Sequence, residues 1–74
     1  MNKARRKKLG EAFDRIEDAK NILEEVKQEE QDAYDNLPEN FQNGDRGEEM
    51  QNYIDMMDET KGYLEDAQSV IEQI

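Results

Sequence analysis

Apolar residues recur every seven positions along most of this 74-residue chain. Counted in heptads from Leu9, four of five a positions are apolar and every d position is Ala or Val. The a positions are Leu9, Ile16, Leu23, Glu30 and Leu37, and the d positions are Ala12, Ala19, Val26 and Ala33. A period near 3.5 residues over four heptads is typical of a helix that lies along another helix. The spacing therefore predicts a first long helix, over about residues 3–36.

A second heptad series follows the first. Its a positions are Met50, Met57, Leu64 and Ile71, and its d positions are Tyr53, Thr60, Ala67 and Ile74. Asp45 lies before this series, and Glu48 lies three residues after Asp45. This spacing resembles a capping box and makes Asp45 the expected N-cap. The pattern predicts a second helix over about residues 47–73.

Residues 37–46 belong to neither series and predict a turn. Pro38 disfavours the helical conformation in the residue before it, so the first helix is expected to stop there. Gly44 and Gly47 permit a reversal of the chain. Phe41 is expected to fold inward and close the end of the structure.

The turn implies a definite register between the helices. If the chain reverses between Leu37 and Met50, residues that face each other have position numbers that add up to 87. The strongest apolar residues satisfy this condition: Leu23 with Leu64, Ile16 with Ile71, and Phe13 with Ile74. We therefore expect an all-α fold, an antiparallel, coiled-coil-like two-helix hairpin over residues 9–74 whose tip is formed by residues 37–46.

The apolar surface is wider than a two-helix hairpin needs. Six apolar side chains lie beside the a and d rows: Phe13, Ile22, Tyr34, Met56, Tyr63 and Val70. Burial would contribute on the order of 1.5–3 kcal/mol for each such side chain. We expect these six residues to form a self-association surface that joins two hairpins into a homodimeric four-helix bundle. The other interpretation is that they cover a core within one chain.

Residues 1–8 form a basic arm with no counterpart on the second helix, so they are expected to overhang. The arm holds five of the ten basic residues: Lys3, Arg5, Arg6, Lys7 and Lys8. It can hold the phosphates of a polyanion, bind the acidic body of a neighbouring subunit, or aid solubility. Residues 9–74 have five bases against twenty acids, a net charge of −15 that would repel nucleic acid. Sequence-specific DNA binding is therefore not favoured.

The composition offers no chemistry for an active site. The chain has no Cys and no His, which removes thiolates, the usual zinc ligands and a proton shuttle at neutral pH. Adjacent acids such as Glu24 and Glu25 point about 100° apart on a helix, so they do not converge on a metal. The tip does not fit a calcium loop, because Phe41 and Met50 occupy ligand positions. A non-enzymatic protein without cofactor or metal is expected.

Glu30 is the one polar residue among the a positions, and two interpretations stand. A buried acid there would form a polar layer that specifies the register of the helices. Alternatively, Glu30 lies near the tip and bends its carboxylate into water.

Nothing in the sequence predicts a membrane segment. No eighteen apolar residues run together. The basic start is followed by charged residues instead of the apolar stretch of a signal peptide. The absence of Cys fits a reducing compartment. We expect a soluble, cytoplasmic protein.

The acidic body suggests a function of a different class. Carboxylates in rows can copy the phosphate spacing of DNA and block a nucleic-acid-binding enzyme of host defence, such as a restriction or RNA-guided nuclease. The acids of such rows would be Asp14, Glu17, Asp18, Glu24, Glu25, Asp55, Asp58, Glu65 and Asp66. Acidic helices also serve solubility alone.

Two short segments carry a resemblance to a known group of proteins. The sequence NLPE at residues 36–39 and RGE at residues 46–48 flank a polar spacer. Over about residues 24–67 the chain resembles small acidic hairpin proteins encoded by bacteriophages and other mobile elements of Gram-positive bacteria. Gly44 and Asp45 depart from the serine-containing spacer of that group. The resemblance implies a mobile-element origin and a location in the host cytoplasm, and it implies no activity. An interaction protein that binds another macromolecule, not yet identified, is the resulting expectation.

Overall fold

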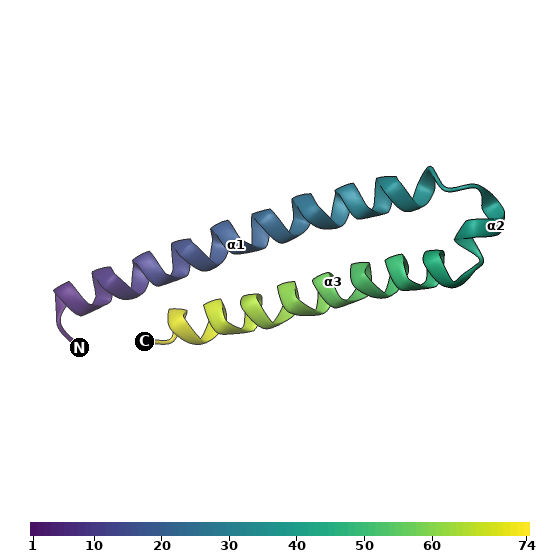
Figure 1. Cartoon of the computed structure of the whole chain (residues 1–74). Helices are drawn as coiled ribbons and strands as arrows, with labels where there is room; N and C mark the ends of the chain where they lie inside the picture. Colours follow the sequence, from purple (N-terminus) through teal and green to yellow (C-terminus); the bar gives the residue numbers. More distant parts are fainter.

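The computed structural model of residues 1–74 is a hairpin of two long helices. Helix α1 spans Lys3–Asp35, the short helix α2 spans Glu39–Gln42, and α3 spans Asp45–Glu72. Helices α1 and α3 lie side by side and antiparallel (Figure 1), and the molecule measures 58 × 15 × 11 Å. The predicted all-α hairpin is confirmed. No helix has an apolar stretch long enough to cross a membrane.

Helix α1 includes most of the basic arm. The Asn2 side chain accepts a hydrogen bond of 2.8 Å from the backbone N–H of Arg5, which satisfies one of the free donors at the helix start. The arm is therefore helical from Lys3 onward. In Figure 1, α1 continues beyond the end of α3 at the open end of the hairpin.

The tip contains α2, which the sequence pattern did not predict. Pro38 precedes it, and its carbonyl accepts hydrogen bonds from the N–H groups of Phe41 and Gln42, at 2.9 and 3.1 Å. The Gln42 side chain donates a 3.0 Å hydrogen bond to the carbonyl oxygen of Tyr34, which also accepts the backbone N–H of Leu37 at 3.0 Å near the end of α1. The expectation that Phe41 folds inward is wrong, because α2 turns Gln42 toward α1 and leaves Phe41 51% exposed.

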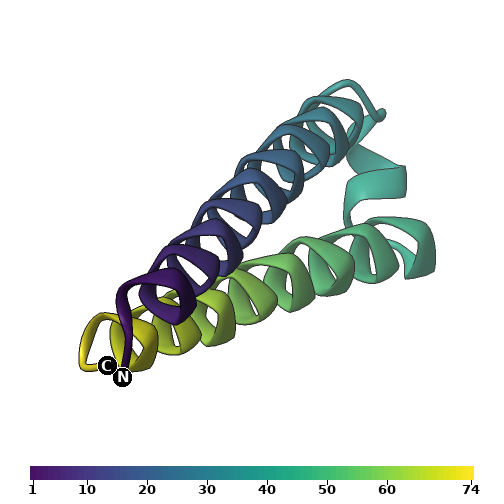
Figure 2. The same cartoon turned by 90° about the vertical axis from the view of Figure 1, so that its left-hand side faces the viewer.

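Helix α3 begins two residues earlier than predicted. Gly44 occupies the N-cap position and Asp45 is the first helical residue, so the expected Asp45 cap is wrong. Asp45 and Glu48 still lie in the first turn, where the helix dipole favours negative charge. Gly47 is buried, and a Cβ atom there would overlap the backbone carbonyl of Gln42. Gly47 therefore allows α2 to lie directly against α3, as the second view shows (Figure 2).

Gly47→Ala is expected to destabilise the protein by about 1–3 kcal/mol, because the added methyl group meets backbone atoms that cannot move aside cheaply. Gly62→Ala is the matched control. A Cβ at Gly62 meets nothing within 4 Å, so this change should stabilise helix α3 by up to about 1 kcal/mol. Urea unfolding of the two variants at one protein concentration measures both effects, and equal stabilities would contradict the assigned role of Gly47.

The two helices meet along the predicted a positions but not along the predicted d positions. All apolar a residues of both helices are half-buried, as is Glu30, which is therefore not enclosed. Of the d residues, only Ala19 is partly covered. The second row of each interface instead lies one residue after the d row: Phe13, Lys20, Lys27 and Tyr34 on α1, and Gly47, Ile54, Lys61 and Gln68 on α3. Each helix is thus rotated by about 50° from the expected orientation.

Side-chain length explains this rotation. The d row of α1 is mainly Ala, whose methyl group is too short to reach the neighbouring helix. The alternative row offers Phe13 and Tyr34, and also Lys20 and Lys27, whose methylene stems lie along apolar surface while their ammonium groups reach carboxylates. The Lys20 side chain is only 14% exposed in this position.

Three ion pairs between α1 and α3 define the register of the two helices. They join Lys20 with Glu65, Lys27 with Asp58, and Lys61 with Glu24. The position numbers of each pair add up to 85. The register deduced from the turn, with a sum of 87, therefore lies within two residues of these contacts.

Candidate interaction surfaces

One face of the hairpin is closed by charged side chains. Lys27 Nζ lies 2.8 Å from Asp58 and 3.5 Å from Glu24, and Lys61 Nζ lies 3.2 Å from the same Glu24 carboxylate. Lys20 extends the series toward the open end, 3.3 Å from Glu17 and 3.7 Å from Glu65. We call this surface the ion-pair face. Its carboxylates belong to the b rows of the two helices, one residue after the a row.

Gln68 anchors the ion-pair face near the open end of the hairpin. It is 5% exposed and is the only buried residue with a polar side chain. Its amide nitrogen donates hydrogen bonds of 2.9 Å to the Glu17 carboxylate and 3.3 Å to the backbone oxygen of Phe13. Its amide oxygen accepts a hydrogen bond of 2.9 Å from Lys20 Nζ. Gln68 therefore joins α3 to both a carboxylate and an ammonium of α1.

These contacts change the ionisation of their members in consistent directions. The hydrogen bond from Gln68, followed by that from Lys20, lowers the pKa of the Glu17 carboxyl. The hydrogen bond from Lys61 and the nearby charge of Lys27 lower the pKa of Glu24. The hydrogen bond to Asp58 raises the pKa of Lys27. Each charged form is thus favoured by its neighbours, so this face is suited to holding the helices together.

The other face carries an uncharged stripe that runs along α3. Its residues follow each other at alternating steps of three and four, and all are exposed. The stripe consists of Tyr53, Met56, Thr60, Tyr63, Ala67, Val70 and Ile74. These are the d and g positions of α3, the same spacing that joins helices in coiled coils. Tyr63 is 65% exposed, and Val70 and Met56 are 59% and 53% exposed.

Helix α1 contributes a matching row of small and apolar side chains. It comprises its d residues, Ala12, Ala19, Val26 and Ala33, together with Ile22 at a g position. Ile22 is 60% exposed. The sequence interpretation placed the Ala residues inside the hairpin, so it missed them as part of an outer surface.

The rows on α1 and α3 face the same way. On each helix the d row lies on one side of the a row, and the b row lies on the opposite side. Because the two helices are antiparallel and face each other through the a row, their d rows come to the same side of the hairpin. The ion pairs of the b rows occupy the reverse side. We call the surface formed by the α3 stripe and the α1 row the apolar face.

The structure separates the six residues of the expected association surface into two groups. Ile22, Met56, Tyr63 and Val70 lie on the apolar face. Phe13 and Tyr34 are half-buried in the row between the helices, toward the ion-pair face. The interpretation that all six cover the core of one chain therefore fits only the last two.

Hydrogen bonds along α3 position both tyrosines of the apolar face. The Tyr63 hydroxyl donates a hydrogen bond of 2.9 Å to the Glu59 carboxylate, and the Tyr53 hydroxyl donates one of 2.8 Å to the Glu49 carboxylate. Each carboxylate lies one helical turn before its tyrosine. The bond to its carboxylate raises the pKa of each phenol. The hydroxyl groups are thus satisfied within α3, which leaves the rings available for apolar contact.

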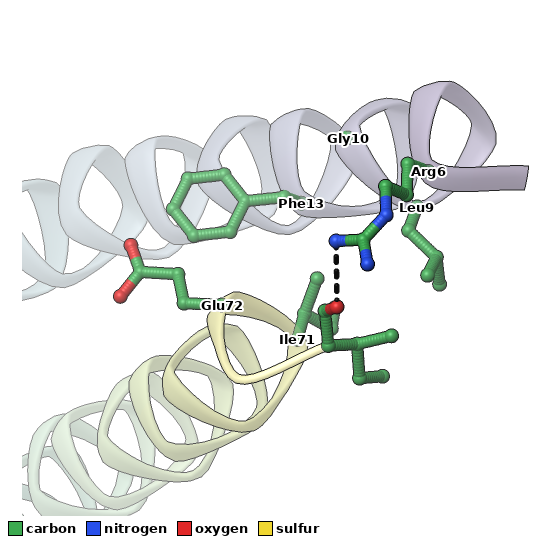
Figure 3. Close-up of a pocket in the computed structure, with 7 residues that line it drawn as sticks. Arg6, Leu9, Gly10, Phe13, Ile71 and Glu72 are labelled. Carbon is green, nitrogen blue, oxygen red and sulfur yellow. Dashed lines mark hydrogen bonds between the residues drawn. The ribbon is translucent and has the colours of Figure 1, made fainter. Parts of the chain in front are cut away.

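The basic arm is not wholly free of the hairpin. Arg6 Nη1 donates a 2.8 Å hydrogen bond to the backbone oxygen of Ile74 (Figure 3), so the expectation of a complete overhang is wrong at this residue. A guanidinium at the C-terminal end of α3 satisfies a free carbonyl and complements the helix dipole. A pocket of about 250 Å³ lies beside this contact, lined by Leu9, Phe13 and Ile71 among others. All five bases of the arm are exposed.

The acids proposed for a DNA-like surface are also divided. Glu17, Glu24, Asp58 and Glu65 pair with lysines of the same chain. The remaining acids are exposed and join no ion pair: Asp14, Asp18, Glu25, Asp55 and Asp66. No group of three or more acidic side chains in the structure is arranged to hold a metal ion.

Comparison with protein-family models, curated proteins and solved structures finds no match to this chain.

Proposed function

We propose that this chain is a non-enzymatic interaction protein, whose hairpins pair through their apolar faces into a four-helix bundle and bind another macromolecule with their outer surface. The observation that carries the proposal is the α3 stripe, seven exposed and uncharged residues at the spacing of a helix interface. Exposed apolar patches of this continuity on small proteins typically mark association sites.

The energetics of a lone hairpin support pairing. Ile54 is the only apolar side chain that is buried, and the apolar a residues are half-exposed. A chain of 74 residues that has no Cys for a disulfide and no cluster of side chains able to hold a metal ion has few other sources of stability. Closing two apolar faces together would cover both the exposed stripe and the open side of the a rows. Each large side chain covered contributes on the order of 1.5–3 kcal/mol.

The outer surface of such a dimer would be strongly acidic. Each chain carries a net charge of −10, so two copies carry −20. Five exposed acids without an ion pair lie on rows that point away from the apolar face: Asp14, Asp18, Glu25, Asp55 and Asp66. A partner with a basic surface matches this charge, whereas nucleic acid would be repelled by it. The resemblance to mobile-element proteins suggests that the partner belongs to a bacterial host cytoplasm.

Sedimentation equilibrium of the full chain over a dilution series tests the proposed self-association. We expect a mass twice the 8.7 kDa of one chain at micromolar concentration, with dissociation on dilution. A protein that stays monomeric at the highest concentration would overturn the proposal.

An acidic inhibitor of a nucleic-acid-binding host defence protein is the second candidate. Five of the nine acids proposed for the DNA-like rows are exposed and join no ion pair, which favours this candidate, since their charge is available to a basic cleft. The four acids engaged by lysines weaken it, because their charge is already compensated.

Reversal of outward charge separates the two candidates. The variant Asp14→Lys, Asp18→Lys, Glu25→Lys and Asp66→Lys should keep the helical content and the dimer, because these residues lie away from both the apolar face and the ion pairs. If the chain is an inhibitor, the variant should also lose at least about 100-fold in affinity for a DNA-binding nuclease whose activity the wild type blocks. Wild-type protein that fails to inhibit any nuclease tested would remove this candidate.

A further inference from the structure

The charges that border the apolar face indicate how a second copy would lie on it. The g row of α1 reads Lys8, Arg15, Ile22, Glu29 and Asn36 from the open end to the tip. Arg15 and Glu29 are both exposed, and neither joins an ion pair within the hairpin. They lie seven residues before and seven residues after Ile22, so the row has opposite charges placed symmetrically about an apolar centre.

The apolar rows of both helices are centred at the same level of the hairpin. The α1 row runs from Ala12 to Ala33, so its midpoint lies beside Ile22. The α3 stripe runs from Tyr53 to Ile74, so its midpoint lies beside Tyr63. The interhelical ion pairs place Ile22 and Tyr63 opposite each other, because their numbers also add up to 85. These two are the most exposed large apolar residues of α1 and α3.

Two face-to-face arrangements with two-fold symmetry are possible. If both tips lie at the same end, α1 of one copy covers α3 of the other. If the tips lie at opposite ends, α1 covers α1 and α3 covers α3, with the symmetry axis passing across the middle of the hairpin. Only in the second arrangement does each apolar row pack against the same row of the second molecule, with the two rows centred at the same level.

We infer that the second copy lies with its tip at the opposite end, so that the two-fold axis passes by Ile22 and Tyr63 and Arg15 of each chain pairs with Glu29 of the other. This inference rests on the proposed self-association. In the arrangement with both tips together, Arg15 would face the end of α3 near Val70, and Glu29 would face Met56. Each charge would then lie against an apolar side chain instead of an opposite charge, which is costly.

The charge along the whole hairpin supports the same orientation. The open end carries the five bases of the arm, whereas the tip carries acids such as Asp35, Glu39 and Asp45. With the tips at opposite ends, the arm of each copy comes level with the acidic tip of the other. With the tips together, the two basic arms would lie at one end and repel each other. This orientation also gives the arm a partner within the dimer.

Two single charge reversals and their mixture test the pairing. Arg15→Glu and Glu29→Arg should each dimerise roughly tenfold more weakly than wild type at low salt, because like charges then meet at two symmetric places. Glu29→Arg is the sharper variant, since it reduces the net charge from −10 to −8 and general repulsion alone would strengthen its dimer. An equimolar mixture of the two variants should form a heterodimer with an affinity within about threefold of wild type, as should the double variant R15E/E29R with itself.

Distances between the tips give an independent readout. The chain has no Cys, so Asn40→Cys provides a single site at the tip for a spin label. Labels at opposite ends of a molecule 58 Å long should show a broad distance of roughly 50 Å or more, whereas labels on adjacent tips would lie within about 25 Å. A wild-type monomer would overturn the proposed function. A wild-type dimer with short label distances, or with tighter association of Glu29→Arg, would overturn this inference and leave the proposed function standing.

Discussion

Replacing Met56, Tyr63 and Val70 together by Gln is expected to convert the dimer into monomers while the chain remains helical. The three side chains are 53–65% exposed in the hairpin, so their removal costs a single chain little. In the proposed dimer both copies would bury them, and the loss should weaken association by about 5 kcal/mol or more. Gln is a good helix former, so α3 itself should persist.

Sedimentation together with circular dichroism measures both parts of this result. The matched control is Asn52→Gln, Asp66→Gln and Ser69→Gln, which places three Gln residues on the outward rows of the same helix. The control should sediment as the wild type does. If the triple variant of the apolar face has the same mass as the wild type, the apolar face is not the site of self-association.

Ile54→Ala is expected to destabilise the fold more than any other single truncation of an apolar residue. Ile54 is 4% exposed and is the only buried apolar side chain, so its removal leaves a cavity at the best-packed place between the helices. Such changes cost about 2–5 kcal/mol. A small domain has a total stability of about 5–15 kcal/mol, so the variant should lose a large share of it.

Urea unfolding at a fixed protein concentration checks this expectation, with Ser69→Ala as an exposed control on α3. The control should change the free energy of unfolding by less than about 0.5 kcal/mol. A loss below 1 kcal/mol for Ile54→Ala would mean that the contacts of Ile54 contribute little to the fold. The ion-pair face would then hold the helices together on its own.

The candidate surfaces were only partly predictable from the sequence. Met56, Tyr63, Val70 and Ile22 are large apolar residues outside the a and d rows, so their excess is visible in the heptad pattern alone. The Ala row of α1 was missed, because apolar residues that recur at d positions usually mark a helix interface. Lys20 and Lys27 were missed as interface residues for the converse reason, since hydropathy assigns lysine to water although its stem is apolar.

Local signals at the tip were also insufficient. Pro38 and the polar spacer correctly predicted where α1 ends and the chain turns. Asp45 was a reasonable N-cap by residue type, but the chain reaches α3 through Gly44, whose backbone alone caps the helix. The role of Gly47 depends on α2 lying against it, and the four residues of α2 are too few to show a period in the sequence.

The sequence by itself determined that the chain forms two long antiparallel helices, where they turn, and their register to within two residues. These properties follow from periodicity and from Pro38, which act through the backbone close to each residue. Only the tertiary structure decided the rotation of each helix about its own axis. Rotation depends on which side chains are long enough to reach the opposite helix, and a small difference between two neighbouring rows settles it. That choice turned the lysines inward, formed the ion-pair face, and left the Ala row beside Met56, Tyr63 and Val70 on one exposed surface.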